Sequence, residues 1–300
     1  MLFKKLKKII YFVLFISLFA SCNKTHNNKS ILFSIKDDLG RELTFEKFPN
    51  KIVSLAPNLT EILFSIGAGD NIVGVTNYCD FPPEATTINK VADLVSVNYE
   101  ALAVVNPDLV LMTVDGNSKE SFDKLISMGI TVFVSNPRNV NGILKSITDF
   151  GILTNNSQKA DSVNNYISTK IDSLQKTISH KNNPKILFLV SIAPIISIGK
   201  NTYLNEIIEL SGGENICAES KINYPIINRE DVLAKNLDYI LLPDDLISTP
   251  AEILKVYTEW KVLNVAKNNR IKLFNADLLQ RPATRVAEAV EEIINITKDK

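Results

Sequence analysis

Residue types that carry out catalysis or hold metal ions are scarce in this chain of 300 residues. Only two histidines are present, His26 and His180, whereas a zinc or manganese site needs several histidines and carboxylates that converge. The spacing of Gly67, Gly69 and Gly74 differs from that of a dinucleotide-binding loop. The sequence also has no phosphate-binding loop with a lysine. It has no serine in a nucleophile elbow either. These observations argue against an enzyme and against direct metal coordination.

An internal repeat places one acidic residue at an equivalent point in each half of the chain. The segment NYEALAVVNPDLVLM at residues 98–112 returns as NREDVLAKNLDYILL at residues 228–242. Each copy has the same order of cap, acid, short helix, turn and apolar strand. The repeat predicts two similar lobes, with these identical residues in matching places: Asn98 and Asn228, Glu100 and Glu230, Asn106 and Asn236, Asp108 and Asp238.

Short strands and helices alternate along the chain, and these elements must position the residues of the repeat. Lys51–Leu55 has the composition of a buried strand, and apolar residues at helical spacing follow it as far as Gly67. Further strands are predicted in NIVGVTN, DLVLMTV, ITVFVSN and KILFLVSI, with a helix around Ser121–Met128. The alternation favours an α/β fold of two Rossmann-like lobes with mostly parallel sheets. Alternating residues around Asp37–Gly40 predict an additional hairpin.

A long bridging helix is predicted between the lobes. Apolar residues recur every three to four positions from Ile143 to Leu174, so we expect a helix from about Gln158 to Ser179, roughly 33 Å long. A single rigid helical connection predicts only small movement when a ligand binds. The expected organisation is a signal peptide at 1–21, a tether at 22–30, an N-terminal lobe at 31–140, a bridging region at 141–183 and a C-terminal lobe at 184–300.

The amino terminus has the layout of an export signal. Four lysines precede the apolar run Ile9–Ala20, which is shorter than the roughly 20 residues that cross a bilayer. Ala20-Ser21 then leads into Cys22, and this resembles the bacterial lipobox, in which the cysteine is acylated, although Phe19 stands in place of the usual leucine. We expect an exported protein, lipid-anchored through Cys22 to a bacterial membrane on its periplasmic or cell-surface side. A plain cleaved signal is the alternative.

Charge and cysteine content narrow the function further. Removal of residues 1–21 takes away four of the 33 basic groups and none of the 33 acidic groups, which leaves a net charge of −4. Nucleic acid is therefore not an expected partner. Only Cys79 and Cys217 remain after Cys22, and two separate thiols are favoured over a disulfide.

The segment KIVSLAPNLTEILFSIGAGDNIVGVTNYCDFPPEA at residues 51–85 is similar to the opening lobe of a known group of proteins. VNYEALAVVNPDLVL, SGGENI, INREDVLAKNLD and ADLLQRPATRVAEAVEEI agree with them in the same order. From these segments, the chain resembles the helical-backbone (class III) substrate-binding proteins of ABC importers, which serve cobalamin, ferric siderophores, haem and some transition metals. The similarity extends over almost everything after residue 30, and is greatest to the cobalamin-binding members.

The resemblance implies a monomeric binding subunit without a cofactor, whose ligand cleft lies between the lobes. It would deliver a small-molecule ligand to an ABC permease dimer with its ATPase subunits. A surface glutamate on each lobe of such proteins docks into arginine pockets of the permease, and the matching positions are Glu100 and Glu230. A second explanation for both acids is the helix dipole, which favours a carboxylate in the first helical turn.

Four residues are expected in the ligand cleft by resemblance: Tyr78, Tyr224, Asp277 and Arg281. Aromatic platforms flanked by hydrogen-bonding groups suit a flat apolar macrocycle edged with amides, so the preferred ligand is cobalamin or another corrinoid. Stacking area is reduced, because cobalamin binders often have tryptophans where this chain has Leu94, Thr113 and Leu278. The only tryptophan, Trp260, is assigned to packing.

Alternatives to a corrinoid delivery protein follow from the same residues. With the smaller stacking area, a cobalamin analogue, another corrinoid or a ferric siderophore could be accommodated, and haem is a further alternative for the same fold. Arg138, Arg281 and Arg285 could supply positive charge to an anionic ligand. A lipid-anchored surface scavenger or adhesion module that works without an importer would share the fold.

Overall fold

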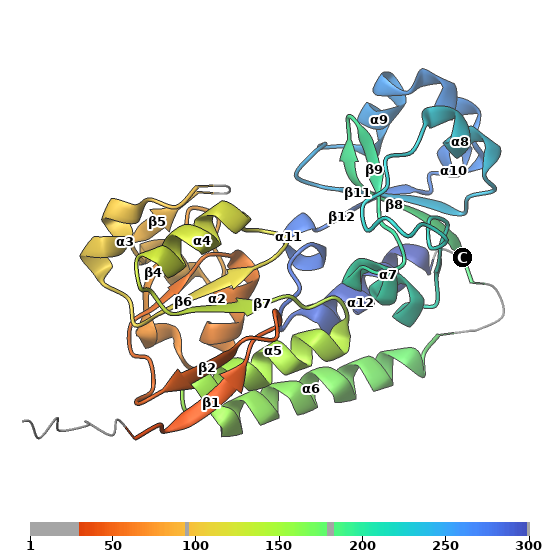
Figure 1. Ribbon diagram of the computed structural model, residues 1–300. Helices are drawn as coiled ribbons and strands as arrows, with labels where there is room; N and C mark the ends of the chain where they lie inside the picture. The colour runs from red at the N-terminus through yellow and green to blue at the C-terminus, as the bar shows by residue number, and fades with distance from the viewer. Residues whose placement is uncertain (1–29, 94–95, 179–182, 299–300) are drawn as a thin grey trace, which may run out of the picture. The chain divides into compact units, whose positions relative to one another are not determined.

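The computed structural model describes residues 30–93, 96–178 and 183–298 (Figure 1). The predicted signal peptide, Cys22, His26, Leu94 and His180 lie outside the described residues. The described chain divides into two compact units, one formed by residues 30–34 with 44–47 and the other by residues 35–43 with those from 48 onward. Strands β1 (Phe33–Lys36) and β2 (Glu42–Phe45) form the predicted hairpin, in which the Phe33 and Phe45 rings stack at 5.0 Å.

The larger unit contains two five-stranded sheets, and the first of them is wholly parallel. Its strand order is β5-β4-β3-β6-β7, so the chain runs outward from β3 in one direction and then returns to add β6 on the other side. Such a reversal leaves a crevice at the carboxyl ends of the two central strands. The strands are β3 (Ile52–Ser54), β4 (Ile72–Thr76), β5 (Lys90–Ala92), β6 (Leu109–Thr113) and β7 (Val132–Ser135).

The second sheet has the order β10-β8-β11-β12, with parallel pairing along this path, and β9 pairs antiparallel with β8. Apolar residues fill the central strands because helices cover both of their faces. The strands are β8 (Lys185–Ile192), β9 (Ile195–Ser197), β10 (Glu214–Asn215), β11 (Tyr239–Pro243) and β12 (Ile271–Phe274).

Helices cover both faces of each sheet. In the first lobe, which is the first sheet with its helices, α3 and α4 pack on a core that includes Leu102 and Leu125, whereas α2 and α5 cover the opposite face. In the second lobe, α8, α9 and α10 lie together on one side of the sheet (Figure 1), and Trp260 belongs to the core cluster that these helices share. The helices are α2 (Pro57–Ser65), η1 (Gly69–Asn71), η2 (Pro83–Thr87), α3 (Tyr99–Val105), α4 (Lys119–Ser127), α5 (Val140–Leu153), α6 (Ser157–Gln175), α7 (Tyr203–Leu210), α8 (Arg229–Ala234), α9 (Pro250–Val256), η3 (Thr258–Val262), α10 (Asn264–Lys267), α11 (Ala276–Leu279) and α12 (Val286–Thr297).

The sequence repeat has a structural counterpart in each sheet. The Asp108 carboxylate accepts the backbone N–H of Lys51 at 3.2 Å, and the Asp238 carboxylate accepts that of Lys185 at 2.8 Å. The backbone N–H of each aspartate donates in return to the carbonyl of the same lysine, both at 2.8 Å. Each aspartate thus ties the start of one central strand to its parallel neighbour. The two lobes begin in the same way because the repeat supplies the same residue at the same point.

The connection between the lobes contains two helices that lie side by side. Helix α6 begins one residue before the predicted start and ends four residues before the predicted end, which makes it about 28 Å long over its 19 residues. Gly151 of α5 lets the helices approach closely, since a Cβ there would lie 2.6 Å from that of Ala160. Helix α6 also contacts α12 of the second lobe. It therefore packs against elements of both lobes, as a bridging element must.

The architecture confirms the predicted fold class, an α/β fold whose lobes are built on parallel sheets. Sequence periodicity located α2, α4 and β8 within two residues of their observed bounds at most ends. Among the described residues, no helix combines the length and the apolar character needed to span a membrane.

Candidate functional site

A pocket of about 430 Å³ lies where strands of both sheets end. Its walls come from the segments that follow β3, β4, β6 and β7 of the first sheet, and from those that follow β9, β10, β11 and β12 of the second. All four residues predicted to contact ligand line it, namely Tyr78, Tyr224, Asp277 and Arg281. Ligands of open α/β sheets bind at this edge, beyond the carboxyl ends of the strands.

Tyr78 offers an aromatic side chain from the first lobe. It follows β4, and its backbone N–H donates to the Thr76 hydroxyl at 3.2 Å, which fixes the turn from which the ring projects. The residue is 46% exposed although it is large and apolar. An exposed aromatic on the wall of a pocket is available for contact with a ligand.

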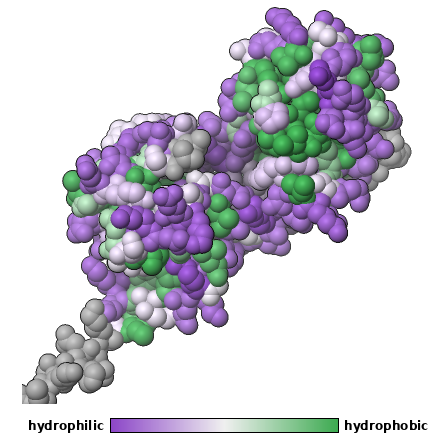
Figure 2. Space-filling model, turned by 45° about the horizontal axis from the view of Figure 1, so that its top comes forward, coloured by the Kyte–Doolittle hydropathy of each residue, from purple (hydrophilic) through white to green (hydrophobic). Residues whose placement is uncertain are grey.

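Tyr224 comes from an extended segment that lies along β9. Gly199 donates its N–H to Asn223, and Ser197 donates its N–H to Pro225, at 2.8 and 3.0 Å. Side chains of the segment alternate, so that residues 222, 224 and 226 are exposed while Pro225 is buried. Figure 2 shows hydrophobic side chains gathered on this half of the molecule, and the large exposed ones are Ile222, Tyr224, Ile226, Leu233, Leu246, Val256 and Val262.

Arg281 is the most extensively paired basic residue of the pocket. Its guanidinium group donates to Asp277, to Asp80 at 2.6 Å and to Glu61 at 3.4 Å. The hydrogen bond from Arg281 lowers the pKa of Asp80 below its ordinary value. Asp80 and Glu61 belong to the first lobe, whereas Arg281 and Asp277 follow β12 of the second. One side chain therefore joins carboxylates of both lobes beside the pocket.

Glu61 is a buried acid that the sequence did not single out. It lies on α2 with its side chain 1% exposed, and Arg285 holds both of its oxygens, with nitrogen–oxygen distances of 2.9 and 2.8 Å. Burial raises the pKa of the Glu61 carboxyl, although Arg285 and Arg281 act in the opposite direction. The Arg285 guanidinium also lies 4.0 Å from the centre of the Phe81 ring. A glutamate at a buried position of an apolar helix was the only signal that could have revealed this site.

A second ion pair lies in the wall formed by the first sheet. Asp115 follows β6 and Arg138 follows β7, and the guanidinium group of Arg138 donates to both oxygens of the Asp115 carboxylate, once at 2.8 Å. Burial raises the pKa of the nearby Tyr224 hydroxyl, and the negative charge of Asp115 raises it further. The charge of Arg138 is thus neutralised by Asp115 within the pocket. Arg285 is bound to Glu61, and neither of these two residues lines the pocket.

Glu100 and Glu230 occupy matching positions away from the pocket. Each is exposed and lies in the first turn of its helix, α3 or α8. The Asn98 side chain caps α3 by accepting the N–H of Ala101, whereas Asn228 makes no such bond in α8. Both carboxylates complement the helix dipole, and that of Glu230 also lies 3.6 Å from the Arg229 guanidinium group.

The remaining residues singled out by the sequence have structural roles. Cys79 and Cys217 are separate buried thiols. Trp260 is buried, stacks on Tyr257 at 4.6 Å and donates its N–H to the Arg229 carbonyl. Of the residues noted in place of tryptophans, Thr113 lines the pocket and Leu278 does not. The described residues contain no group of three or more histidine, cysteine or acidic side chains arranged to hold a metal ion.

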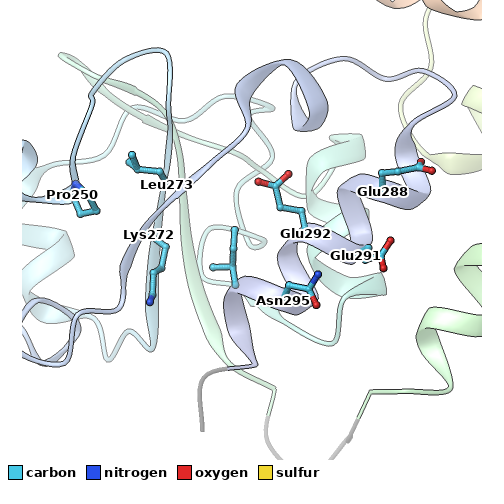
Figure 3. A pocket seen from close by; sticks show the side chains of 8 residues that line it. Pro250, Lys272, Leu273, Glu288, Glu291, Glu292 and Asn295 are labelled. Carbon is cyan, nitrogen blue, oxygen red and sulfur yellow. The ribbon is translucent and has the colours of Figure 1, made fainter.

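A larger cavity, of about 580 Å³, lies beside α12 (Figure 3). Glu288 and Glu291 of this helix share Lys170, at 3.1 and 3.0 Å, and Glu292 accepts the backbone N–H of Asn275 at 2.8 Å. Figure 3 shows Lys272 and Leu273 of β12 alongside these acids. The carboxylates are engaged by the protein itself, and none of the predicted ligand residues is present. The smaller cavity at the strand ends is therefore the candidate ligand site.

Comparison with known proteins identifies the family of the chain. A family model described as periplasmic binding protein matches residues 52–291, which include both sheets. The chain belongs to the periplasmic binding protein family. A vitamin B12-binding protein of Vibrio cholerae serotype O1 is 28% identical over 258 residues, which are 85% of this chain and 92% of that protein.

Two further matches extend the comparison of this periplasmic binding protein. An uncharacterised ABC transporter substrate-binding lipoprotein of Bacillus subtilis is 31% identical over 267 residues, which are 87% of this chain and 83% of that protein. The crystal structure of the periplasmic vitamin B12 binding protein of Vibrio cholerae has a TM-score of 0.75 at 28% identity, and covers 83% of this chain and 97% of its own. The resemblance to substrate-binding proteins of ABC importers, and among them to cobalamin-binding members, is confirmed.

We expect the substitution Glu61→Ala to lower the free energy of unfolding by about 3 kcal/mol, because it leaves two largely buried guanidinium groups without their shared carboxylate. Asp123→Ala is the matched control. Asp123 pairs with Lys119 on the exposed surface of α4, where an ion pair is worth at most about 1 kcal/mol. Urea unfolding of the three proteins measures the difference. Equal midpoints for the two variants would show that Glu61 is not a structural anchor.

Proposed function

We propose that this periplasmic binding protein captures cobalamin or a related corrinoid and delivers it to the permease of an ABC importer. The observation that carries the proposal is the convergence of Tyr78 and Tyr224 on one pocket at the carboxyl ends of the strands. Flat macrocycles edged with amides are held by aromatic contact and by a few hydrogen-bonding groups. The similarity to a vitamin B12-binding protein over most of both chains supports the same class of ligand.

The polar groups of the pocket also suit an amide-edged ligand. Asn58, Asn136 and Gln280 line it and offer both donors and acceptors. Its two arginines are already bound to carboxylates of the protein, so a neutral ligand meets no unbalanced positive charge. Ferric siderophores and haem are the competing ligands, and the two propionates of haem carry negative charge that this lining does not balance.

Titration with cyanocobalamin and cobinamide, followed by calorimetry and by the visible absorption of the corrin ring, tests the ligand. Trp260 is buried in a core away from the pocket, so its fluorescence is a poor reporter. We expect dissociation constants of micromolar or below, and losses of about tenfold for Tyr78→Ala and for Tyr224→Ala. Tyr166→Ala, on the exposed face of α6, is the control and should bind as the unmodified protein does. Absence of corrinoid binding at micromolar concentration would reject the ligand.

Delivery is proposed to depend on Glu100 and Glu230. Two carboxylates at equivalent points of two similar lobes present a pseudo-twofold pattern, which complements a permease built as a twofold dimer with its ATPase subunits. A monomer of the binding protein is sufficient for such an encounter. Exposed charge pairs of this kind fix register and association rate more than affinity.

Reversal of both charges, Glu100→Lys with Glu230→Lys, should abolish ligand uptake by cells while the purified protein retains its affinity for ligand. The double variant repels the arginine pockets that the wild type attracts. Glu120→Lys changes another exposed acid in the first turn of a helix, α4, and should leave uptake intact. Normal uptake by the double variant would favour a scavenger that works without an importer.

Anchoring is proposed to occur through acylated Cys22, since the residues before it have the layout of a lipoprotein signal and one relative is a lipoprotein. Cys22→Ser should shift the protein from the membrane fraction to the soluble fraction of cells. Cys79→Ser alters a buried thiol and should leave the protein with the membrane. Membrane association of the Cys22 variant would instead indicate a different anchor.

A further inference from the structure

The charges of the candidate pocket are unevenly balanced. Its lining contains three carboxylates, those of Asp115, Asp245 and Asp277, and two guanidinium groups, those of Arg138 and Arg281, so its formal net charge is −1. No other charged side chain of the described residues belongs to the lining. Because the pocket is partly shielded from water, a single unit of charge has a larger effect there than on the open surface.

Asp115 occupies the groups of Arg138 that would otherwise recognise an anion. A guanidinium group binds a carboxylate through two parallel N–H donors, and Asp115 already accepts from both terminal nitrogens of Arg138. An incoming carboxylate would have to displace a side chain that the protein itself supplies. Arg138 therefore gives the pocket no free fork for an anionic ligand.

The loop that carries Asp115 is braced without any ligand. The Asn117 side chain accepts the backbone N–H of Thr113 at 2.9 Å and donates to the Leu55 carbonyl at 2.9 Å. Strands β6 and β7, which precede Asp115 and Arg138, are parallel neighbours paired as far as Thr113 and Ser135. Asp115 and Arg138 thus follow the ends of two adjacent strands, and the last paired residues of these strands are directly opposite each other. Their pairing is a property of the fold.

Arg281, the arginine that the second lobe contributes to the lining, is likewise bound to carboxylates of the protein. Arg281 donates to Asp277, and also to Asp80 and Glu61, whose side chains lie behind the pocket. Loss of Asp277 alone leaves two acids on Arg281, whereas loss of Asp115 leaves Arg138 with no carboxylate partner among the described residues. The two pairs are therefore unequal, and Asp115 has the greater influence on the charge presented to a ligand.

We propose that Asp115 is a specificity-determining residue, which fills the fork of Arg138 so that the pocket accepts neutral, amide-edged ligands and disfavours ligands that carry carboxylates in their place. This inference rests on the proposed function, because it assigns a cause to the choice among macrocycles that the same pocket could enclose. The Asp115 carboxylate is the repulsive element, since it disfavours a ligand carboxylate, and specific binding sites often include such an element.

The test compares two corrinoids that share the corrin ring and differ in the groups at its edge. Cobinamide carries amides around the corrin ring, and cobyrinic acid carries carboxylates in their place. Calorimetry should show that the wild-type protein prefers cobinamide. Asp115→Asn should shift the ratio of the two affinities toward cobyrinic acid by about tenfold, since it removes a negative charge and frees a guanidinium fork. Asp277→Asn should shift it in the same direction by a smaller factor. Arg138→Gln should shift it the opposite way.

Asp123→Asn removes an acid of equal charge from the exposed surface of α4 and should leave the ratio unchanged. An unchanged ratio in Asp115→Asn, or an equal shift in Asp123→Asn, would overturn the inference. Ferric haem, whose ring carries two propionate carboxylates, separates this failure from that of the proposed function. If no corrinoid binds, the proposed ligand is wrong, yet a rise in haem affinity for Asp115→Asn over Asp123→Asn would still support the role of Asp115. Equal haem affinities would then contradict it.

Discussion

The arrangement of the site depends on one buried carboxylate, that of Glu61. It lies on the first helix of the first lobe and is held by Arg285 and Arg281, which follow the last strand of the second. A carboxylate in such surroundings is costly without charged partners, and its pKa is accordingly raised by burial. The two arginines offset this cost, and Glu61 together with Asp80 and Asp277 holds Arg281 at the wall of the pocket. The position of Arg281 is therefore a consequence of the interior as much as of the pocket.

Much of the architecture could be predicted because it rests on local patterns. β-Branched runs between helical segments indicate parallel sheets, and the repeat indicates two lobes. The structure adds the reason that Asp108 and Asp238 recur, since each fastens the beginning of a central strand. The helical connection was predicted with an error of four residues at its end. Its partner α5 was not separated from it in advance, because only Asn155, in a left-handed conformation, marks the break.

The site was predictable in part. Resemblance to a family brought Tyr78, Tyr224, Asp277 and Arg281 forward, and the structure brings all four to one pocket, although their contact with a ligand stays a prediction. Glu61 and Asp115 were missed because ion pairs between distant segments leave no periodic trace in a sequence. Arg138 and Arg285 were considered as sources of positive charge, yet each is bound to an acid of the protein. A count of arginines in the sequence therefore overstates the positive charge that the folded pocket presents to a ligand.

The segment that carries Tyr224 also bears on how such a protein can change over generations. Its backbone hydrogen bonds to β9 and its buried proline fix the course of the chain, whatever side chains occupy the exposed positions 222, 224 and 226. Substitution of Tyr224 changes the lining of the pocket without altering the backbone hydrogen bonds to β9. Descendants of one gene can therefore change one wall of the pocket through a side chain whose backbone stays in place. The same arrangement gives a protein engineer a confined place at which to randomise residues.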